Sequence, residues 1–254
     1  MDKKLSLQLD LLVKDLERDT RVVVFTGAGM SAESGIPTFR GKGGLWEKYD
    51  PAVVATAEAL QLRPRAVWEM HDTLRQTIAA CKPNPGHDAI AELEDLFSAV
   101  TVITQNVDNF HQDAGSTNVY ELHGNAWRVK CVAEGKSWVD RTVPYEELPP
   151  KCQCGAMLRP DVVFFNEPLD EAVLNKSFIE AGKAKLMLIV GTSYTVYPAA
   201  YVPILAKQNG ALLVEFNIEY TGLSAFADVS FYGKSGEILP LFVQKLKNHL
   251  AKKE

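Results

Sequence analysis

Four short runs of mostly apolar residues constrain the fold more than any other feature of the chain. They cover residues 21–26, 100–104, 186–190 and 211–216. Apolar residues recur at helical spacing in other stretches, which predicts helices over residues 3–18, 87–97, 198–208 and 235–252. Runs as apolar as these four are typical of parallel strands that are buried on both faces. The alternation therefore predicts an α/β fold, with a Rossmann-like parallel sheet and helices on both of its faces.

Two segments lack this alternation. Residues 41–83 contain a pair of glycines, several prolines and a helical stretch, and residues 126–160 contain three cysteines among prolines and charged residues. We predict that 41–83 form a helical insertion and 126–160 a zinc-ribbon-like insertion, which together make a smaller lobe. The Rossmann-like domain then comprises residues 1–40, 84–125 and 161–254.

Composition excludes several classes of protein. A chain of 254 residues buries a sizeable core as one large domain with insertions. The formal net charge of −5, with scattered acidic residues, argues against a direct nucleic-acid partner. The apolar runs are too short to span a bilayer, the first residues show no export signal, and four cysteines make no disulfide framework. We therefore expect a cytoplasmic enzyme without a membrane partner.

A glycine-rich loop follows the first predicted strand. Residues 27–32 satisfy the pattern G-x-G-x-x-[G/A], in which glycines let the backbone approach a pyrophosphate. The alternative is a plain tight turn. A dehydrogenase of this fold also needs an acidic residue at the end of a second strand about 20 residues further on. Residues 46–50 contain no such strand, so we expect a dinucleotide to be held differently here.

Polar residues follow the second predicted strand. Gln105, Asn106 and Asp108 lie where ligands bind in open α/β sheets, beyond the carboxyl ends of the strands. The alternative role for Asp108 is to cap the helix that follows. His123 comes fifteen residues later, and an imidazole with a pKa near 6.5 is suited to act as a general base, although a structural histidine is the alternative.

Three of the four cysteines share one segment. Cys131 precedes Cys152 and Cys154, whereas a structural zinc ribbon normally supplies four ligands as two C-x2-C pairs. Glu134 stands three residues after Cys131, but its oxygen is harder than a thiolate, and no histidine lies between residues 124 and 248. Both zinc binding and a lobe held by packing alone therefore stay open.

Taken together, these residues resemble the sirtuin family of NAD-dependent protein deacylases over residues 20–240. The resemblance rests on six separated motifs in the family's order: G-A-G-M-S-A-E-S-G-I-P-T-F-R at 27–40, T-Q-N-V-D at 104–108, L-H-G at 122–124, V-V-F-F-N-E at 162–167, G-T-S at 191–193 and F-N at 216–217.

The resemblance implies a reaction. The carbonyl oxygen of an acyl-lysine attacks the anomeric carbon of the nicotinamide ribose of NAD and expels nicotinamide. His123 then takes a proton from a ribose hydroxyl, while Asn106 and Asp108 orient the nicotinamide carboxamide and a water. These three residues are the implied catalytic residues, and an acyl-lysine protein or peptide is the implied partner.

The resemblance also implies binding residues. The implied contacts to NAD are Gly27, Ala28, Gly29, Ser31, Phe39, Arg40, Gln105, Asn106, Val107, Asp108, Gly191, Thr192, Ser193 and Asn217. The peptide is expected to add as a strand between two segments. The implied substrate-binding residues are Val163, Phe164, Phe165 and Tyr197. The implied structural zinc would be held by Cys131, Cys152 and Cys154, one ligand short of the family's set.

Two further departures from the family's pattern bear on the substrate. Asn166 stands where the family usually has glycine, beside the implied peptide path. Sirtuins that remove succinyl or malonyl groups resemble one another in a Tyr-x-x-Arg pair, and here His71 and Leu74 align with that pair. Arg75 is one residue, or about 100° around a helix, away from the arginine position. We therefore predict a preference for uncharged acyl groups over succinyl.

Three alternative functions stay open. A protein ADP-ribosyltransferase would use the same cofactor site, and a catalytically silent NAD-binding protein would need neither His123 nor the polar cluster. A plain NAD(P) oxidoreductase is disfavoured by the missing acidic residue. The sequence leaves the oligomeric state, the physiological substrate and the pathway open.

Overall fold

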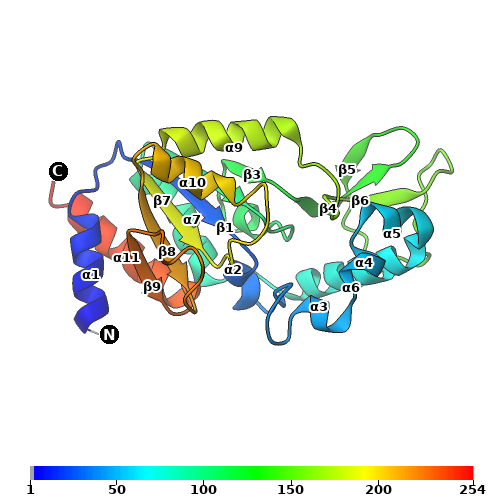
Figure 1. Ribbon diagram of the computed structural model, residues 1–254, viewed down its shortest axis with the longest axis horizontal. Helices are drawn as coiled ribbons and strands as arrows, with labels where there is room; N and C mark the ends of the chain where they lie inside the picture. Colours follow the sequence, from blue (N-terminus) through cyan, green and yellow to red (C-terminus); the bar gives the residue numbers. More distant parts are fainter. Residues whose placement is uncertain (1–2, 254) are drawn as a thin grey trace.

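The computed structural model describes residues 3–253 (Figure 1). Its helices are α1 (Lys3–Val13), α2 (Gly29–Ala32), α3 (Leu45–Lys48), α4 (Pro51–Val54), α5 (Ala57–Leu62), α6 (Pro64–Ala80), α7 (Pro85–Leu96), α8 (Phe110–Asp113), α9 (Glu171–Lys183), α10 (Tyr201–Gln208) and α11 (Ser235–Leu250). Its strands are β1 (Arg21–Thr26), β2 (Ala99–Thr104), β3 (Val119–Glu121), β4 (Gly124–Cys131), β5 (Ser137–Val139), β6 (Leu158–Val162), β7 (Leu186–Val190), β8 (Leu212–Asn217) and β9 (Val229–Tyr232).

The larger lobe is built on a parallel sheet, as predicted. Its strand order is β3-β2-β1-β7-β8-β9, and every neighbouring pair runs parallel. The four predicted strands are the central four of this sheet, so both of their faces are covered. This burial explains why their sequences are continuously apolar rather than alternating. The α/β fold with a Rossmann-like sheet is therefore confirmed.

Alternate residues of β1 serve two different cores. Val22 and Val24 pack with α1, α7 and α11 on one face, whereas Val23 and Phe25 pack with α9 and α10 on the other. Figure 1 shows α9 and α10 together along one side of the sheet. The sheet is thus the middle layer of three, with the ends of its strands left open between the helices.

The two terminal helices pack against each other. Leu9 and Leu12 of α1 belong to the same core cluster as Leu246 and Leu250 of α11. Lys245 also donates to Ser6 and Asp10, at 2.8 Å each. Figure 1 places α1 and α11 at the side of the larger lobe that is remote from the smaller lobe.

The smaller lobe contains the two predicted insertions. Residues 41–83 supply α3 to α6 and no strand, and a separate antiparallel sheet has the order β5-β4-β6. Trp68 of α6 joins them, because its indole N–H donates to the carbonyl of Leu158 in β6 at 2.8 Å. The division into domains at residues 40, 83, 125 and 160 stays a prediction.

Some predicted elements differ in detail. The helix predicted over 3–18 ends at Val13, and the chain then turns, with Leu16 donating to the Val13 carbonyl at 3.1 Å. Leu16 is nevertheless buried, which explains why it continued the apolar pattern beyond the helix. The helix predicted over 198–208 begins only at Tyr201. Two edge strands, β3 and β9, and the helix α9 were missed.

Within residues 3–253, no helix is both long and apolar enough to cross a bilayer.

Candidate active site

The glycine loop packs against a second loop of the sheet. Gly27 donates to the carbonyl of Val190 at 3.0 Å, and Gly29 donates to the carbonyl of Gly191 at 2.8 Å. A Cβ on Gly29 would lie 2.8 Å from the Gly191 oxygen, and a Cβ on Gly191 would lie 2.2 Å from the Met30 nitrogen. The sequence predicted that the glycines of the first loop let the backbone approach a cofactor. The contacts show that these glycines also let the two loops pack closely against each other.

A small cavity lies beside this loop and brings together many of the predicted residues. The expected members of its lining are Ala28, Ser31, Phe39, Asn106, Val107 and Asp108. The apolar members are Ile36, Pro37, Leu45, Leu74 and Ile78, of which the sequence reasoning had singled out only Leu74, for its alignment with the arginine of the Tyr-x-x-Arg pair. Leu74 and Ile78 are four residues apart on α6, so helical spacing was the signal that places them on one face. The cavity is therefore lined by the polar side chains of Ser31, Asn106 and Asp108 together with apolar side chains, among them Leu74 and Ile78 of α6.

Asn106 and Asp108 are fixed by a buried hydrogen-bond network. The Asn106 side-chain amide donates to the carbonyl of Gly27 at 3.0 Å and contacts Ser31 Oγ at 3.3 Å. Ser31 in turn donates to Asp108 Oδ2 at 2.6 Å. Burial raises the pKa of Asp108, and the bonds from Ser31 and from the Phe110 backbone oppose that rise. The Phe110 N–H lies 2.9 Å from Asp108 Oδ1, so Asp108 also forms the turn that precedes α8.

His123 is held in one tautomer. Its Nδ1 lies 3.0 Å from the carbonyl oxygen of Gln105. A carbonyl only accepts hydrogen bonds, so Nδ1 carries the proton and Nε2 keeps its lone pair. Burial lowers the pKa of His123, although the bond to Gln105 opposes this shift. His123 does not line the small cavity itself, but Gln105 ties it directly to Asn106, which does.

The remaining predicted cofactor residues lie around the two loops that follow β1 and β7. The Gln105 side chain donates to the Thr26 carbonyl at 3.3 Å and to Thr192 Oγ1 at 3.1 Å. Asn217 donates to the Thr192 carbonyl at 3.0 Å. Ser193 is exposed and lies 3.0 Å from Thr195 Oγ1. These contacts join the ends of β1, β2, β7 and β8, so the predicted residues do gather at one edge of the sheet.

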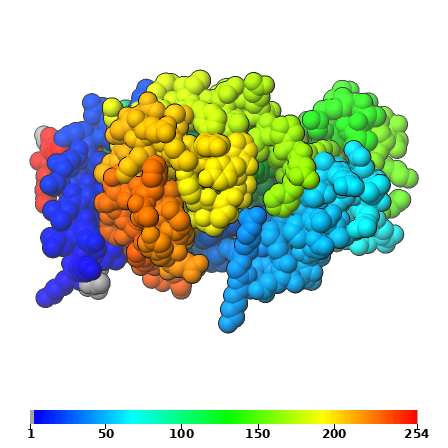
Figure 2. Space-filling model, in the orientation of Figure 1, coloured from blue at the N-terminus to red at the C-terminus, as the bar shows by residue number. Residues whose placement is uncertain are grey.

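Arg40 lies in a second, more open hollow next to the cavity. Phe39, Lys42, Trp46 and Glu47 line the same hollow. The Phe39 and Trp46 rings pack with centroids 5.3 Å apart. Figure 2 shows light-blue atoms of this part of the chain and yellow atoms near residue 195 on either side of the boundary between the lobes. Phe39 therefore borders both hollows.

The predicted peptide segment is already hydrogen-bonded along its backbone. The N–H groups of Val163 and Phe165 donate to the carbonyls of His123 and Ala55, at 2.9 and 2.8 Å. The Phe164 N–H lies 3.0 Å from a carboxylate oxygen of Glu167. A peptide that adds here as a strand must therefore bond to carbonyl oxygens or to neighbouring residues. The substrate contact stays a prediction, as does that of Tyr197, which is exposed and packs on Tyr201 at 5.0 Å.

Glu167 and Arg159 support this segment, and the sequence reasoning gave them no role. Two oxygens of Glu167 and two nitrogens of Arg159 form a parallel pair, each contact 2.7 Å long. Burial alone would raise the pKa of Glu167, but Arg159 and the Phe164 N–H lower it below the usual value. Asn166, between the segment and Glu167, has φ = 69°. Glycine adopts this conformation most easily and asparagine tolerates it, which accounts physically for the substitution.

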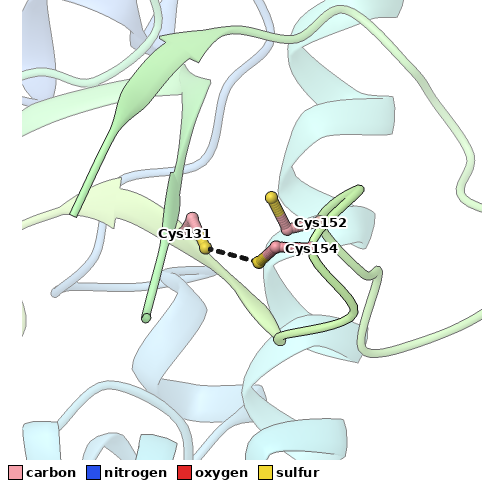
Figure 3. A group of neighbouring side chains, drawn as sticks. All are labelled: Cys131, Cys152 and Cys154. Atoms are coloured by element: carbon pink, nitrogen blue, oxygen red, sulfur yellow. Dashed lines mark hydrogen bonds between the residues drawn. The ribbon is translucent and has the colours of Figure 1, made fainter. Parts of the chain in front are cut away.

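The three expected cysteines meet in the smaller lobe. Cys131 comes from β4, while Cys152 and Cys154 come from the loop before β6, and Figure 3 shows their side chains converging. All three sulfur atoms lie within 4.8 Å of one another. The residues present therefore fit a metal such as zinc, as a set of three thiolates.

A buried carboxylate, Glu215, was also missed. It is fully buried in β8 and accepts hydrogen bonds from Thr221 Oγ1 at 2.8 Å and Ser230 Oγ at 2.9 Å. Its Oε1 also lies 3.5 Å from the side-chain nitrogen of Asn217. Glu215 thus ties Asn217 to the loop after β8 and to β9.

Replacing Glu215 with glutamine is expected to weaken cofactor binding. The amide cannot accept every bond that the carboxylate accepts, and an unmatched buried polar group costs about 1–3 kcal/mol. If Asn217 contacts the adenosine ribose, the KM for NAD rises about tenfold while kcat changes less. Steady-state kinetics of Glu215→Gln and of the exposed-acid control Glu92→Gln measure this. An unchanged KM would show that Glu215 does not position the cofactor.

The fold and the site together define an α/β enzyme of the nucleotide-binding class, with a polar pocket at the carboxyl edge of its sheet. Residues 27–198 match the Sir2 family. The chain is 49% identical over 241 residues to NAD-dependent protein deacylase 2 of Pyrobaculum aerophilum, covering 94% of this chain and 96% of that protein. The chain belongs to the Sir2 family.

Two solved structures agree with this assignment. A mutant of a Sir2 homologue in complex with ADP-ribose is 39% identical, with a TM-score of 0.90, covering 99% of this chain and 98% of that chain. Sir2Af2 bound to a myristoylated histone peptide is 34% identical, with a TM-score of 0.78, covering 100% of both chains. Both similarities extend over the two lobes.

Proposed function

We propose that this chain is an NAD-dependent protein-lysine deacylase that transfers an acyl group from lysine to the ADP-ribose part of NAD and releases nicotinamide. The observation that carries the proposal is the fixed tautomer of His123, which is hydrogen-bonded to the backbone of Gln105, the residue before Asn106 in the lining of the cavity. The similar protein from Pyrobaculum aerophilum is named for this activity. Nearly equal lengths of the two chains support its transfer to the whole protein.

The residues of the pocket have separable roles in this reaction. Bound NAD supplies an electrophilic anomeric carbon with nicotinamide as its leaving group. Asn106 and Asp108, held by Ser31 and the Gly27 carbonyl, orient polar groups at that end of the cofactor. Phe39 shields the pocket from water at its open side. His123 accepts a proton at Nε2 because its Nδ1 proton is committed to Gln105.

The other proposed cofactor contacts come from the loops after β1 and β7 and from residues next to them. Gly27, Ala28, Gly29 and Gly191 supply backbone at the ends of β1 and β7, and Arg40 supplies positive charge beside Phe39. Thr192, Ser193, Asn217 and the Gln105 side chain lie where the phosphate and the adenosine ribose would bind. Val107 closes the pocket next to Asn106.

The intact polar network argues against a catalytically silent protein. Ser31, Asn106 and Asp108 are buried and hydrogen-bonded to one another, which is costly to retain without a role. Transfer of ADP-ribose to a protein nucleophile remains an alternative for the same pocket. The two activities differ because only deacylation requires an acyl-lysine for nicotinamide release.

Nicotinamide release from NAD, measured with and without an acetyl-lysine peptide, tests the proposal. We expect release that depends on the acetyl group and that matches the amount of deacetylated peptide formed. Release that is equally fast with the unmodified peptide would favour the transferase alternative, and no release with any acylated peptide would contradict the deacylase activity.

We further propose that uncharged acyl groups are preferred over succinyl. Leu74 presents an apolar side chain to the cavity. Arg75 turns away from it, because its guanidinium donates to the carbonyls of Asp140 and Thr142 at 2.6 and 2.9 Å. His71 is buried against Phe164, and burial with two nearby arginines lowers its pKa to about 3. No cation on this face of α6 is therefore placed to bind a second carboxylate.

Kinetics with acetyl-lysine and succinyl-lysine versions of one peptide test this preference. An unpaired buried carboxylate costs several kcal/mol, so we expect kcat/KM to be at least about 100-fold higher for the acetyl peptide. Leu74→Arg, which introduces the arginine of the succinyl- and malonyl-removing sirtuins, should lower the ratio of kcat/KM for the acetyl peptide to that for the succinyl peptide. Faster removal of succinyl by the unmodified protein would overturn the proposal.

The peptide partner and the cellular location are part of the same proposal. The myristoylated histone peptide bound to Sir2Af2 supports an acylated peptide as substrate, and direct nucleic-acid or membrane partners are not expected. The four cysteines are unpaired, which fits a reducing cytoplasm.

A further inference from the structure

The start of β4 is hydrogen-bonded to residues 107–109, which we call the pocket segment. Figure 1 shows β4 at the junction between the two lobes. The backbone N–H of Ala126 donates to the carbonyl of Val107 at 2.7 Å. The indole N–H of Trp127 is buried and donates to the carbonyl of Asp108 at 3.2 Å. Val107 and Asp108 line the small cavity, so these two bonds fix the backbone of its wall.

A third contact joins the last residue of the pocket segment to β4. The side-chain amide of Asn125 donates to Oδ1 of Asn109 at 2.9 Å, and Asn125 Oδ1 accepts the backbone N–H of Trp127 at 2.8 Å. Asn109 has φ = 74°, in the left-handed region that few residues other than glycine and asparagine adopt. The contacts from β4 therefore stabilise an uncommon turn directly after Asp108.

The Trp127 ring is itself held in place. Arg75 and Arg141 lie over the ring, with their Cζ atoms 5.3 and 4.6 Å from its centroid. Arg75 is buried, and its guanidinium is fixed by the carbonyls of Asp140 and Thr142. The ring also belongs to the core cluster that contains the two α6 residues of the cavity lining. These contacts leave the ring little freedom to turn, so its N–H stays directed at the pocket segment.

We propose that Trp127 is a positioning residue for the part of the pocket that receives nicotinamide. Trp127 does not line the small cavity and acts through the backbone of Asp108. Without the indole N–H, the buried Asp108 carbonyl loses a hydrogen bond, and the pocket segment shifts to recover one elsewhere. That shift displaces the Asp108 carboxylate and leaves the adenosine end of the cofactor site unchanged. The inference rests on the proposed function, because it identifies what holds one of the groups that orient nicotinamide.

Nicotinamide inhibition and ADP-ribose binding of the full-length protein distinguish positioning from a general structural role. Trp127→Phe keeps an aromatic ring and removes the indole N–H. We expect the inhibition constant for nicotinamide and the KM for NAD to rise about tenfold, as is typical when a buried acceptor loses its donor. ADP-ribose lacks the nicotinamide group, so its dissociation constant should change less than about twofold.

Trp68→Phe is the matched control. It also removes a buried indole N–H that donates to a backbone carbonyl in the smaller lobe, that of Leu158. This bond lies outside the pocket segment, so the control variant should lose stability but keep the nicotinamide inhibition constant of the unmodified protein.

Asn109→Gly is a second test that does not depend on Trp127→Phe folding. Glycine adopts the left-handed turn without strain, so the variant keeps its fold and loses only side-chain contacts, among them the one to Asn125. Its nicotinamide inhibition constant should rise by about threefold or more, since a hydrogen bond that holds the pocket segment is lost.

Two results would overturn the positioning role while leaving the proposed function intact. One is an unchanged nicotinamide inhibition constant in Trp127→Phe or, if that variant does not fold, in Asn109→Gly. The other is an equal loss of nicotinamide inhibition and of ADP-ribose binding, which would show a general structural role. No nicotinamide release by the unmodified protein would instead contradict the proposed function, and this inference with it.

Discussion

Replacing His123 with alanine is expected to lower the rate of deacylation about 10²–10⁴-fold, which is the usual contribution of a general base. The fixed Nδ1–H···O contact to Gln105 presents Nε2 as the base, and alanine removes that atom. Because burial lowers the pKa of His123, the unmodified enzyme should keep its base deprotonated below pH 6.5. The acid limb of kcat/KM should therefore fall at a pH below 6.5. Quantifying the deacylated peptide over pH 5–8 measures both effects.

NAD binding is the control for this variant. His123 does not line the small cavity, so the dissociation constant for NAD should change less than threefold in His123→Ala. A variant that binds NAD normally and deacylates at the normal rate would remove His123 from the mechanism. A variant that has lost NAD binding would mean that His123 positions the cofactor instead.

Mild acid is expected to destabilise the fold by several kcal/mol, because three histidines are buried in the neutral form. Burial lowers the pKa of His71 to about 3 and that of His87 to about 4, and it lowers the pKa of His111 well below its usual value. Unfolded histidine has a pKa near 6.5, so below that pH the unfolded chain binds protons that the folded chain does not. The unfolding free energy should fall as the pH drops from 6.5 towards 4. At 1.36 kcal/mol per pKa unit, His71 and His87 each account for about 3 kcal/mol at pH 4.

Urea unfolding at pH 7 and pH 4.5 checks the acid effect. His71→Gln removes one titrating group at nearly the same size, so its unfolding free energy should depend less steeply on pH. Lys14→Gln is a suitable control because Lys14 is exposed, so this variant should keep the pH dependence of the unfolding free energy of the unmodified protein. An unfolding free energy that is flat between these pH values would show that the buried histidines are protonated or accessible in the fold.

The central sheet was predictable because its four central strands are covered on both faces. β1, β2, β7 and β8 read as short, nearly continuous apolar runs, which are typical of buried parallel strands. The edge strands β3 and β9 were missed because they are short and only partly buried. The helix α9 was missed because its polar residues obscure the apolar face that covers the sheet.

The convergence of the polar residues was predictable from motifs, but the contacts that support these residues were not. The polar residues after β1 and β2 converge because parallel strands end at one edge of the sheet. Glu215, Arg159 and Glu167 act through partners that lie 6 to 15 residues away, in a different element or loop, and residue spacing gives no signal for such contacts. The close packing of the two glycine loops could not be predicted from the sequence either. A side chain at Gly29 would collide with the backbone at Gly191, and one at Gly191 would collide with the backbone after Gly29, which only the folded chain shows.

The packing of α1 against α11 has a practical consequence for work with this protein. Both helices lie on the flank of the larger lobe that faces away from the cysteine cluster and the peptide segment. An affinity handle, a fluorescent reporter or a surface-immobilisation linker can therefore be attached through either of these helices without covering the cysteine cluster or the predicted peptide segment.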